Sequence, residues 1–470
     1  MNKTKVIASI GPASQDEATL KALMMNGIDA VRINMSHADF DFCDDIVRKV
    51  QTLNQTLKKN VAIMVDIPGP TVRIDRVKDG CVTFKAGTTV CIHMKEITGD
   101  HTKISVNYPG LASDVKCHSI IKIDDGKIIL EVIDKEPEML ICNVIQGGLV
   151  RDHKSLNVPG VPLNIPFLRD YDRQIITYAH QNHLDFLALS FVRSSEDILE
   201  VNDLLIELGN DHLGIVAKIE NEQAIEDIDQ IIKASDAVMV ARGDLGVEIP
   251  FERLPGLQKM ILRKCHIAGV VSIVATEILS SMEDEMIPTR AEVSDLANAV
   301  LDGVDAVMLS GETTTGKYPV ETTMMMERII ASSEEDINYY EFVETSMRTE
   351  KQDITGNIAY SVTDCANRLK CIAIVAPTVT GYTARKISRF RPSCPIIALC
   401  PDPETARSLA LHFAVQPVHV KKLDQLDKMI HVAKECVKTY IERNEGHYIL
   451  TGGYPFEGVK HTNFMRIEKL

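Results

Sequence analysis

The chain has 470 residues, a formal net charge of −15, 45% hydrophobic residues and 25% charged residues. This length indicates roughly three domains, and the composition is typical of a soluble globular protein. The acidic balance argues against a nucleic-acid partner, and no apolar run approaches the roughly 20 residues that cross a membrane.

The opening MNKTKVIASIGPAS lacks the apolar core and cleavage site of a signal peptide, and a strand pattern begins almost at once. The eleven cysteines are scattered without a CxxC pair, and several lie in apolar runs. We therefore expect a cytoplasmic protein whose cysteines are reduced core residues.

Three strand patterns open the chain, at 4–10, 29–37 and 61–66. Arg32, Asn34 and Ser36 alternate with apolar residues in the second pattern, so they share one face. The polar face of an ordinary edge strand would explain these residues. Among buried strands, however, three polar groups at the C-terminal end of a strand are typical of a ligand site.

The pattern changes after Arg73. From about Val72 to Pro166, short strands and turns follow one another without a long amphipathic helix, and Asp125-Gly126 is a hairpin signal. We interpret 72–166 as an inserted all-β module. It closes with Lys154 to Gly160, a rigid exit suited to a hinge.

Alternation of helix and strand patterns then resumes, with strands at 186–193, 215–220, 237–244, 270–276 and 306–310. Together with the first three strands this makes eight βα units, the count of a (β/α)₈ TIM barrel. The sequence therefore predicts a barrel over 1–71 and 167–340, with the inserted all-β module at 72–166. In such a barrel the C-terminal ends of the strands face the active site, and those ends carry Arg32, Asn34, Asp66, Lys218, Glu220, Asp244 and Thr276.

The stretch from Gly214 to Glu248 carries the strongest chemical signal. Lys218 and Glu220 point to the same side of an apolar strand, where both are costly to bury without partners. A hard cation and an anionic substrate would satisfy them, with Asp244 on the next strand completing the cation site. A salt bridge at the strand end is the alternative.

After about Tyr340, the segment EFVETSMRTEKQDI is polar and typical of a linker. The rest of 341–470 predicts a separate C-terminal α/β domain with strands at 371–376, 396–399 and 447–450. The loop at 378–383 opens a helix, and its hydroxyls, glycine and helix N-terminus favour an anion site, although a plain turn would also explain it.

Several long blocks are highly specific: SIGPAS, VRINMSH, IVAKIENEQAI, MVARGDLGVEIP and TRAEVSDLANAVLDGVDAVMLSGET. Through them the chain closely resembles the pyruvate kinases over essentially its whole length. The resemblance implies transfer of a phosphoryl group from phosphoenolpyruvate to ADP, giving pyruvate and ATP. It also implies a barrel with a β lid and a C-terminal effector domain, Mg²⁺ (or Mn²⁺) and a homotetramer.

The resemblance implies a role for each residue that matches a family motif. The expected catalytic and substrate-binding residues are Lys218, Arg32, Thr276, Gly243, Asp244 and Ser310. The expected Mg²⁺ ligands are Glu220 and Asp244, and the expected nucleotide contacts are Asn34, His37, Arg73 and Lys154. The expected monovalent-cation ligands are Asn34, Ser36, Asp66 and the carbonyl of Ile67. Lys218 or a water near Thr276 would protonate the enolate.

The sequence departs from the family pattern at several positions. Pro68 and Thr71 replace a lysine and a glutamate, and that glutamate goes with K⁺ dependence in the family, so K⁺ dependence stays open. Glu277 replaces a glutamine, and its charge should repel an anionic substrate. Ser194 and Thr314 are minor changes.

The loop at 378–383 resembles the effector-phosphate loop of members that sugar phosphates activate. The expected effector residues are Thr378, Thr380, Gly381, Tyr382 and Thr383. Val379 stands where some members have lysine, so the remaining candidate cations are Arg385, Lys386, Arg389 and Lys460.

Two other functions fit some of these features. One is a divergent paralogue that binds sugar phosphate and turns over poorly, which the departures at Pro68, Thr71 and Glu277 motivate. The other is a Mg²⁺-dependent lyase or aldolase on the same barrel. The lid, Arg73 and Lys154 favour a nucleotide and argue against the lyase.

Overall fold

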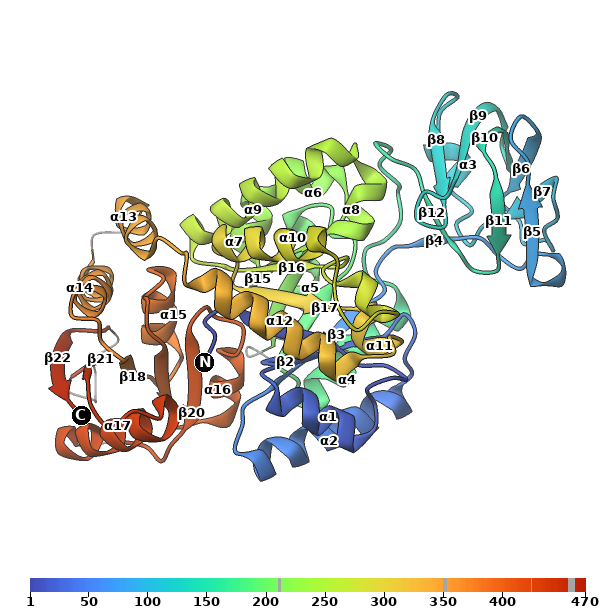
Figure 1. Ribbon diagram of the computed structural model, residues 1–470. Helices are drawn as coiled ribbons and strands as arrows, with labels where there is room; N and C mark the ends of the chain where they lie inside the picture. Colours follow the sequence, from blue (N-terminus) through green and yellow to red (C-terminus); the bar gives the residue numbers. More distant parts are fainter. Residues whose placement is uncertain (210–212, 350–352, 424, 455–460) are drawn as a thin grey trace.

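The computed structural model describes residues 1–209, 213–349, 353–423, 425–454 and 461–470 (Figure 1). A central barrel lies between a β lid, which stands off one end, and a C-terminal α/β domain. No helix in the described ranges is long and apolar enough to cross a membrane.

Eight parallel strands close the barrel in the order β1-β17-β16-β15-β14-β13-β3-β2. They are nearly continuous runs of buried apolar residues, as expected of strands covered on both faces. The predicted barrel is therefore confirmed. Its strands are β1 (Lys5–Ser9), β2 (Ala30–Asn34), β3 (Ala62–Ile67), β13 (Phe186–Leu189), β14 (Gly214–Ile219), β15 (Ala237–Ala241), β16 (Val271–Ala275) and β17 (Ala306–Leu309).

Amphipathic helices surround the barrel, as in α2, which buries Cys43, Ile46, Val47, Val50 and Leu53. The helical segments of the barrel are α1 (Glu17–Met25), α2 (Phe40–Leu57), α4 (Asp170–Gln181), α5 (Ser195–Glu207), α6 (Glu222–Glu226), α7 (Ile228–Ala234), α8 (Arg242–Glu248), η2 (Phe251–Arg253), α9 (Leu254–Ala268), η3 (Ser280–Glu283), α10 (Arg290–Leu301), α11 (Gly311–Thr314) and α12 (Pro319–Glu334).

Two predictions for the stretch from Gly214 to Glu248 were wrong in detail. The single helix expected between its strands is split into α6 and α7 at Asp227, whose carboxylate accepts a hydrogen bond from Ser195 N. Asp244 lies in the first turn of α8 rather than on a strand, because β15 ends at Ala241. A carboxylate in the first turn of a helix is favoured by the backbone N–H groups there.

The lid has its own apolar core, which runs from Val72 to Val158 along the chain. Its main sheet has the order β4-β12-β8-β9-β10-β6-β7, and β11 pairs with β5. The elements are β4 (Val72–Arg73), η1 (Lys78–Gly80), β5 (Cys81–Phe84), β6 (Thr89–His93), β7 (Lys103–Ser105), α3 (Leu111–Asp114), β8 (Ile120–Ile123), β9 (Ile128–Glu136), β10 (Met139–Gln146), β11 (Gly148–Arg151) and β12 (Ser155–Asn157).

The chain leaves the barrel for the lid through Pro68-Gly69-Pro70. Gly69 has φ +64, and a Cβ there would lie 2.3 Å from the carbonyl oxygen of Ser190. Only glycine tolerates both this positive φ and this close approach, so the connection packs tightly against Ser190 at the end of β13.

The C-terminal domain is built on a five-stranded sheet of order β20-β19-β18-β21-β22, in which only β22 is antiparallel. The sequence predicted β18, β19 and β21 but missed both edge strands. One contains Pro417 and the other is mostly exposed, so neither has a clear strand pattern. The elements are α14 (Ile354–Arg368), β18 (Ala373–Pro377), α15 (Tyr382–Arg389), β19 (Ile396–Cys400), α16 (Pro403–Ser408), β20 (Val415–His419), α17 (Leu426–Ile441), β21 (His447–Gly452) and β22 (Phe464–Lys469).

The expected linker after Tyr340 is instead helix α13 (Tyr339–Thr349). Phe342 stacks on His266 of the barrel with ring centroids 5.2 Å apart, while Val343 is buried in the core of the C-terminal domain. The helix is polar because only part of its surface is buried, and this composition caused the wrong prediction.

The C-terminal domain closes the N-terminal end of the barrel. Ala410 and Leu411 belong to the same buried cluster as the side chains that fill the barrel interior. Arg391 pairs with Asp305 at 2.6 Å and Arg407 pairs with Asp185 at 2.7 Å, both across this junction.

Six of the eleven cysteines are buried, whereas Cys81 and Cys117 are exposed on the lid. The expectation of core cysteines therefore holds for only part of the set.

Candidate active site

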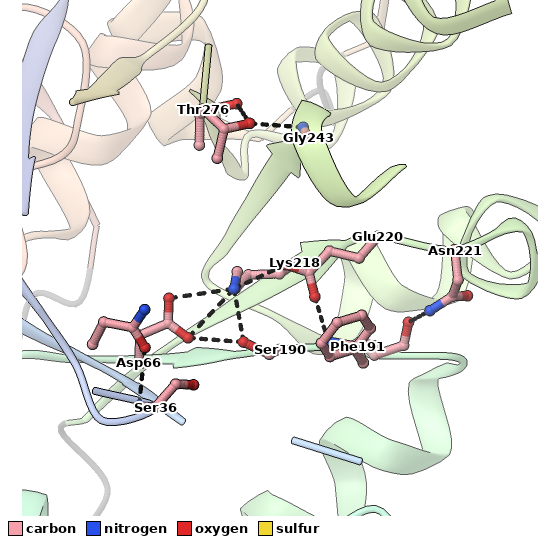
Figure 2. A network of polar contacts seen from close by, with 12 residues as sticks. Ser36, Asp66, Ser190, Phe191, Lys218, Glu220, Asn221, Gly243 and Thr276 are labelled. Carbon is pink, nitrogen blue, oxygen red and sulfur yellow. Dashed lines mark hydrogen bonds and ion pairs between the residues drawn. The ribbon is translucent and has the colours of Figure 1, made fainter. Parts of the chain in front are cut away.

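The C-terminal ends of neighbouring barrel strands bring together a compact charged network (Figure 2). Asp66, on β3, lies at its centre. The Nη2 and Nε of Arg32 are 2.6 and 2.7 Å from Asp66 Oδ2, and Arg32 Nη1 also donates to Ser9 Oγ at 3.1 Å. Lys218 Nζ lies 3.3 Å from Asp66 Oδ2 and 3.4 Å from Oδ1. Ser190 joins the two by donating to Asp66 Oδ1 at 2.9 Å and accepting from Lys218 Nζ at 2.7 Å.

Glu220 follows β14 and is fully buried. Its Oε2 accepts a hydrogen bond of 2.6 Å from Phe191 N, and Phe191 has a left-handed backbone with φ +57. Its Oε1 is 2.8 Å from Lys218 Nζ but outside hydrogen-bond geometry, so this buried oxygen has no hydrogen-bond partner in the described residues. A ligand at Oε1 of Glu220 would therefore share this oxygen with the Lys218 ammonium group.

Burial and neighbouring charges shift the proton affinities of these groups in opposite directions. Burial raises the pKa of Glu220 to about 7 and also raises the pKa of Asp244. Burial alone would raise the pKa of Asp66, but Arg32 and Lys218 outweigh it and hold that pKa below its ordinary value. Burial opposes the charge on Lys218, yet Asp66 and Glu220 raise its pKa overall. Arg32 and Lys218 therefore favour the charged form of Asp66, whereas at Glu220 and Asp244 the effect of burial outweighs that of Lys218.

A second polar group lies apart from this network, at the ends of β15 and β16. Gly243 N, in α8, donates to Thr276 Oγ1 at 2.8 Å, and Thr276 Oγ1 donates to the carbonyl of Ala275 at 2.7 Å. Thr276 and Glu277 both have left-handed backbones, with φ +65 and +53. The Glu277 side chain is exposed.

The residues expected to contact the nucleotide come from the barrel and from the base of the lid. Arg73 ends β4, which pairs with β12, and Lys154 immediately precedes β12. Arg73 Nη1 donates to the carbonyl of His153 at 3.0 Å. The ammonium group of Lys154 is 2.7 Å from Asp124 Oδ1. On the barrel, burial lowers the pKa of His37, and the nearby Arg73 and Arg32 lower it further.

The expected monovalent-cation ligands lie along the adjacent ends of β2 and β3. Asn34 is paired with Asp66 in the strand register, and Asn34 Oδ1 accepts from Ser36 N at 3.1 Å. Ile67 is the last residue of β3. Both oxygens of Asp66 already contact Arg32 or Lys218, so a cation there would have to share them.

Ser310, which follows β17, has a buried hydroxyl without a hydrogen-bond partner in the described residues. Its N–H donates to Glu312 Oε2 at 2.7 Å. Sequence reasoning missed Glu312, Ser190 and Arg242, whose guanidinium group donates to the carbonyls of Thr276 and Glu277. Ser190 follows a predicted strand directly, so its position at a strand end could have identified it.

The last two residues of the expected effector loop, Tyr382 and Thr383, lie in the first turn of α15, which begins two residues earlier than predicted. Gly381 caps the helix with φ +78, and Thr383 Oγ1 is 2.8 Å from Thr462 Oγ1. Lys460, one of the candidate cations, lies outside the described residues. Arg385 donates to the carbonyl of Thr380 at 2.7 Å.

Metal-binding capacity in this region rests on two carboxylates. The described ranges contain no group of three or more His, Cys, Asp or Glu side chains arranged to hold a metal ion. Glu220 and Asp244 could supply two oxygens and would leave other positions to a substrate or water. Mg²⁺ is commonly bound in this way, through one or two carboxylates and the oxygens of a phosphorylated substrate.

Comparison with known proteins identifies the family. The family model "Pyruvate kinase, barrel domain" matches residues 1–323, and "Pyruvate kinase, alpha/beta domain" matches residues 356–468. A pyruvate kinase of Clostridium perfringens is 38% identical over 100% of both chains. A pyruvate kinase of Geobacillus stearothermophilus is 38% identical over 99% of this chain and 80% of its own length.

A solved structure agrees with the sequence comparisons. A crystal structure of a pyruvate kinase from Cryptosporidium parvum superposes with a TM-score of 0.93 at 33% identity, over 100% of this chain and 96% of that one. These relatives give no support to a low-turnover regulator or to a lyase. The chain belongs to the pyruvate kinase family, the phosphotransferases that transfer a phosphoryl group from phosphoenolpyruvate to ADP and release pyruvate and ATP.

Proposed function

We propose that phosphoryl transfer takes place between the Asp66 network and the Thr276 loop, with Lys218 and Arg32 contacting the transferred group. The observation that carries this proposal is the buried array of Arg32, Lys218, Asp66 and Glu220 at the strand ends. Phosphoryl transfer depends mainly on positioning and on neutralising charge. Fixed cations in a site of low dielectric supply both.

We propose Glu220 and Asp244 as the protein ligands of Mg²⁺ (or Mn²⁺). The buried Oε1 of Glu220, which contacts Lys218 only as an ion pair, and the raised pKa values of both carboxylates support this assignment, because a cation would remove the cost of burying their charges. When bound, Mg²⁺ would neutralise phosphoryl oxygens. Without it, three carboxylates face two cations, which disfavours an anionic substrate.

We propose that the carboxylate of phosphoenolpyruvate lies against the N-terminus of α8, near the N–H groups of Gly243 and Asp244. Orphan N–H groups in the first helical turn bind anions. Thr276 Oγ1 accepts the Gly243 N–H in the described structure, which supports an exchange of that hydrogen bond for one to the substrate. Thr276 and Ser310 would then line the enolate, which is protonated by Lys218 or by a water near Thr276.

We propose that ADP binds between the barrel and the lid, through Asn34, His37, Arg73 and Lys154. The lid already contacts α8: Asn157 Nδ2 donates to Glu248 Oε1 at 2.9 Å, and Lys122 Nζ donates to the carbonyl of Val247. A lid in contact with the helix that carries Asp244 would exclude water, which otherwise competes with ADP for the phosphoryl group.

A coupled assay with phosphoenolpyruvate, ADP and Mg²⁺ tests the assignment. Lys218→Met should lower kcat by about 10²- to 10³-fold, the usual effect of removing one electrostatic stabiliser of a transition state. Lys259→Met is the matched control, because Lys259 is an exposed lysine paired with Asp302. Equal activity of the two variants would refute the role of Lys218.

We propose a K⁺ site whose oxygen ligands come from Asn34, Ser36, Asp66 and the carbonyl of Ile67. Replacing K⁺ with tetramethylammonium at constant ionic strength tests it. Full activity in the organic cation would remove K⁺ from the mechanism.

We propose activation by a sugar phosphate at Thr378, Thr380, Gly381, Tyr382 and Thr383, since hydroxyls lie before and within the first turn of α15 there. This proposal of sugar-phosphate activation fails if the substrate saturation curve is unchanged by fructose bisphosphate, by ribose 5-phosphate and by glucose 6-phosphate.

A cytoplasmic homotetramer is proposed as well. Phe251, Met286 and Ile287 are 75%, 57% and 71% exposed, as expected of surfaces that pair with another subunit. Light scattering of the purified protein measures the assembly, and a monomer would contradict it.

A further inference from the structure

The guanidinium group of Arg242 connects the two loops that form the second half of the site. Arg242 is the first residue of α8 and is only 7% exposed. Its Nη2 donates to the carbonyl of Thr276 at 2.8 Å and to the carbonyl of Glu277 at 2.7 Å, and its Nε donates to Thr276 O at 3.2 Å. Its Nη1 pairs with Asp295 of α10.

These contacts explain an otherwise unfavourable backbone. Thr276 and Glu277 are consecutive non-glycine residues in the left-handed region, which costs roughly 1–2 kcal/mol for each residue. Such a conformation persists only where surrounding contacts determine it. The Arg242 guanidinium group supplies those contacts by donating hydrogen bonds to two successive carbonyl oxygens. Hydrogen bonds from a charged donor are strong.

The left-handed backbone at Thr276 and Glu277 also sets the position of the Thr276 hydroxyl. Thr276 Oγ1 accepts from Gly243 N, which is the residue next to Arg242. Arg242 therefore holds both partners of this hydrogen bond, one through its own backbone and the other through its side chain. A shift of either loop would separate the hydroxyl from the N–H.

We propose that Arg242, anchored by Asp295, is a positioning residue that fixes Thr276 Oγ1 and Gly243 N–H for phosphoenolpyruvate. The inference rests on the proposed substrate role of Thr276 and Gly243 and adds to it the residue pair that sets their geometry. Arg242 does not touch the reacting atoms. Its effect acts on phosphoenolpyruvate and leaves the ADP contacts, which lie on other elements, unchanged.

Arg242→Lys and Asp295→Asn test this proposal in the full-length protein. The lysine keeps the charge but loses the fork that reaches two carbonyls, and the asparagine loosens Arg242 without removing it. Asp302→Asn is the matched control: it removes a carboxylate at the C-terminal end of the same helix, where Asp302 pairs with Lys259.

We expect Arg242→Lys to raise the KM for phosphoenolpyruvate by at least about tenfold and Asp295→Asn by about threefold, with the KM for ADP unchanged. Calorimetric binding of phosphoenolpyruvate with Mg²⁺ should weaken in the same order, and this measurement needs no turnover. Asp302→Asn should match the wild type in both.

Equal increases in the KM for phosphoenolpyruvate and for ADP would indicate general loosening and overturn the proposal. So would a wild-type affinity for phosphoenolpyruvate in both Arg242→Lys and Asp295→Asn. Failure of the proposed substrate site would be recognised separately, because Gly243→Ala would then also keep the wild-type KM for phosphoenolpyruvate.

Discussion

Gly243→Ala separates the substrate role of this glycine from any role in folding. The backbone of Gly243 lies outside the left-handed region, so alanine can adopt it without strain. A Cβ at this position would lie 3.4 Å from Thr276 Oγ1 and 3.8 Å from Thr276 Cβ, which are ordinary van der Waals contacts. The protein itself therefore has room for the methyl group.

The two expected effects have opposite signs. Alanine in place of glycine within a helix stabilises it by up to about 1 kcal/mol. The same methyl group fills the space beside the Thr276 hydroxyl, where we place the substrate carboxylate. Overpacking of this kind costs about 1–3 kcal/mol, which corresponds to an increase of about 5- to 150-fold in the KM for phosphoenolpyruvate.

Thermal unfolding and the coupled assay measure the two effects on the same preparation. Gly256→Ala, in α9, is the matched control because a Cβ there meets nothing within 4 Å. The control should keep the wild-type KM. An unchanged KM in Gly243→Ala would refute the placement of the carboxylate, and a lowered unfolding midpoint would refute the steric argument.

Three further predictions concern Ser190 and Glu220 of the charged network and the exposed Glu277. Ser190→Ala removes a donor to Asp66 and an acceptor for Lys218, so kcat should fall about 10- to 100-fold. The control Ser194→Ala, which loses no helix-capping hydrogen bond, should leave kcat unchanged. Equal kcat values in the two variants would contradict the role of Ser190. The pKa of Glu220, about 7 in the folded protein, is above its ordinary value, so its contribution to stability is present at low pH and is lost as pH rises toward 7, unless a cation compensates. Mg²⁺ should consequently raise the unfolding midpoint more at pH 8 than at pH 6. The half-saturating Mg²⁺ concentration should rise by up to about tenfold from pH 7 to pH 6. A half-saturating concentration that does not depend on pH would contradict the assignment of Glu220 as a Mg²⁺ ligand. Glu277→Gln should lower the KM for phosphoenolpyruvate by no more than about fivefold, because the side chain is exposed and its charge is screened; an unchanged KM across the working pH range would refute the repulsion.

The barrel was predictable from the sequence because its signal is local and repeated. Each strand is a short apolar run, each is followed by an amphipathic pattern, and eight such units admit few folds. The strand ends that carry Asp66, Lys218 and Glu220 followed from the same periodicity. The edge strands β20 and β22 were missed because edge strands need not be continuously apolar.

The contacts that organise the site were less visible in the sequence. Arg242 and Thr276 are 34 residues apart, and nothing in this spacing indicates that the Arg242 guanidinium group binds the Thr276 carbonyl. The position of Asp244 was assigned to a strand because the apolar run before it gave no sign that β15 ends at Ala241. Both features depend on tertiary contacts that outweigh local preference.

The seating of Ala410 and Leu411 in the barrel interior has a consequence for how this protein is made. The cluster that fills the barrel draws on β1, near the start of the chain, and on residues more than 400 positions later. A nascent chain released only up to α12 would expose the apolar end of a nearly finished barrel, together with Asp185 and Asp305 deprived of their arginines. We therefore expect the last step of barrel assembly to require the C-terminal domain, and truncation before Arg391 to give a chain that aggregates.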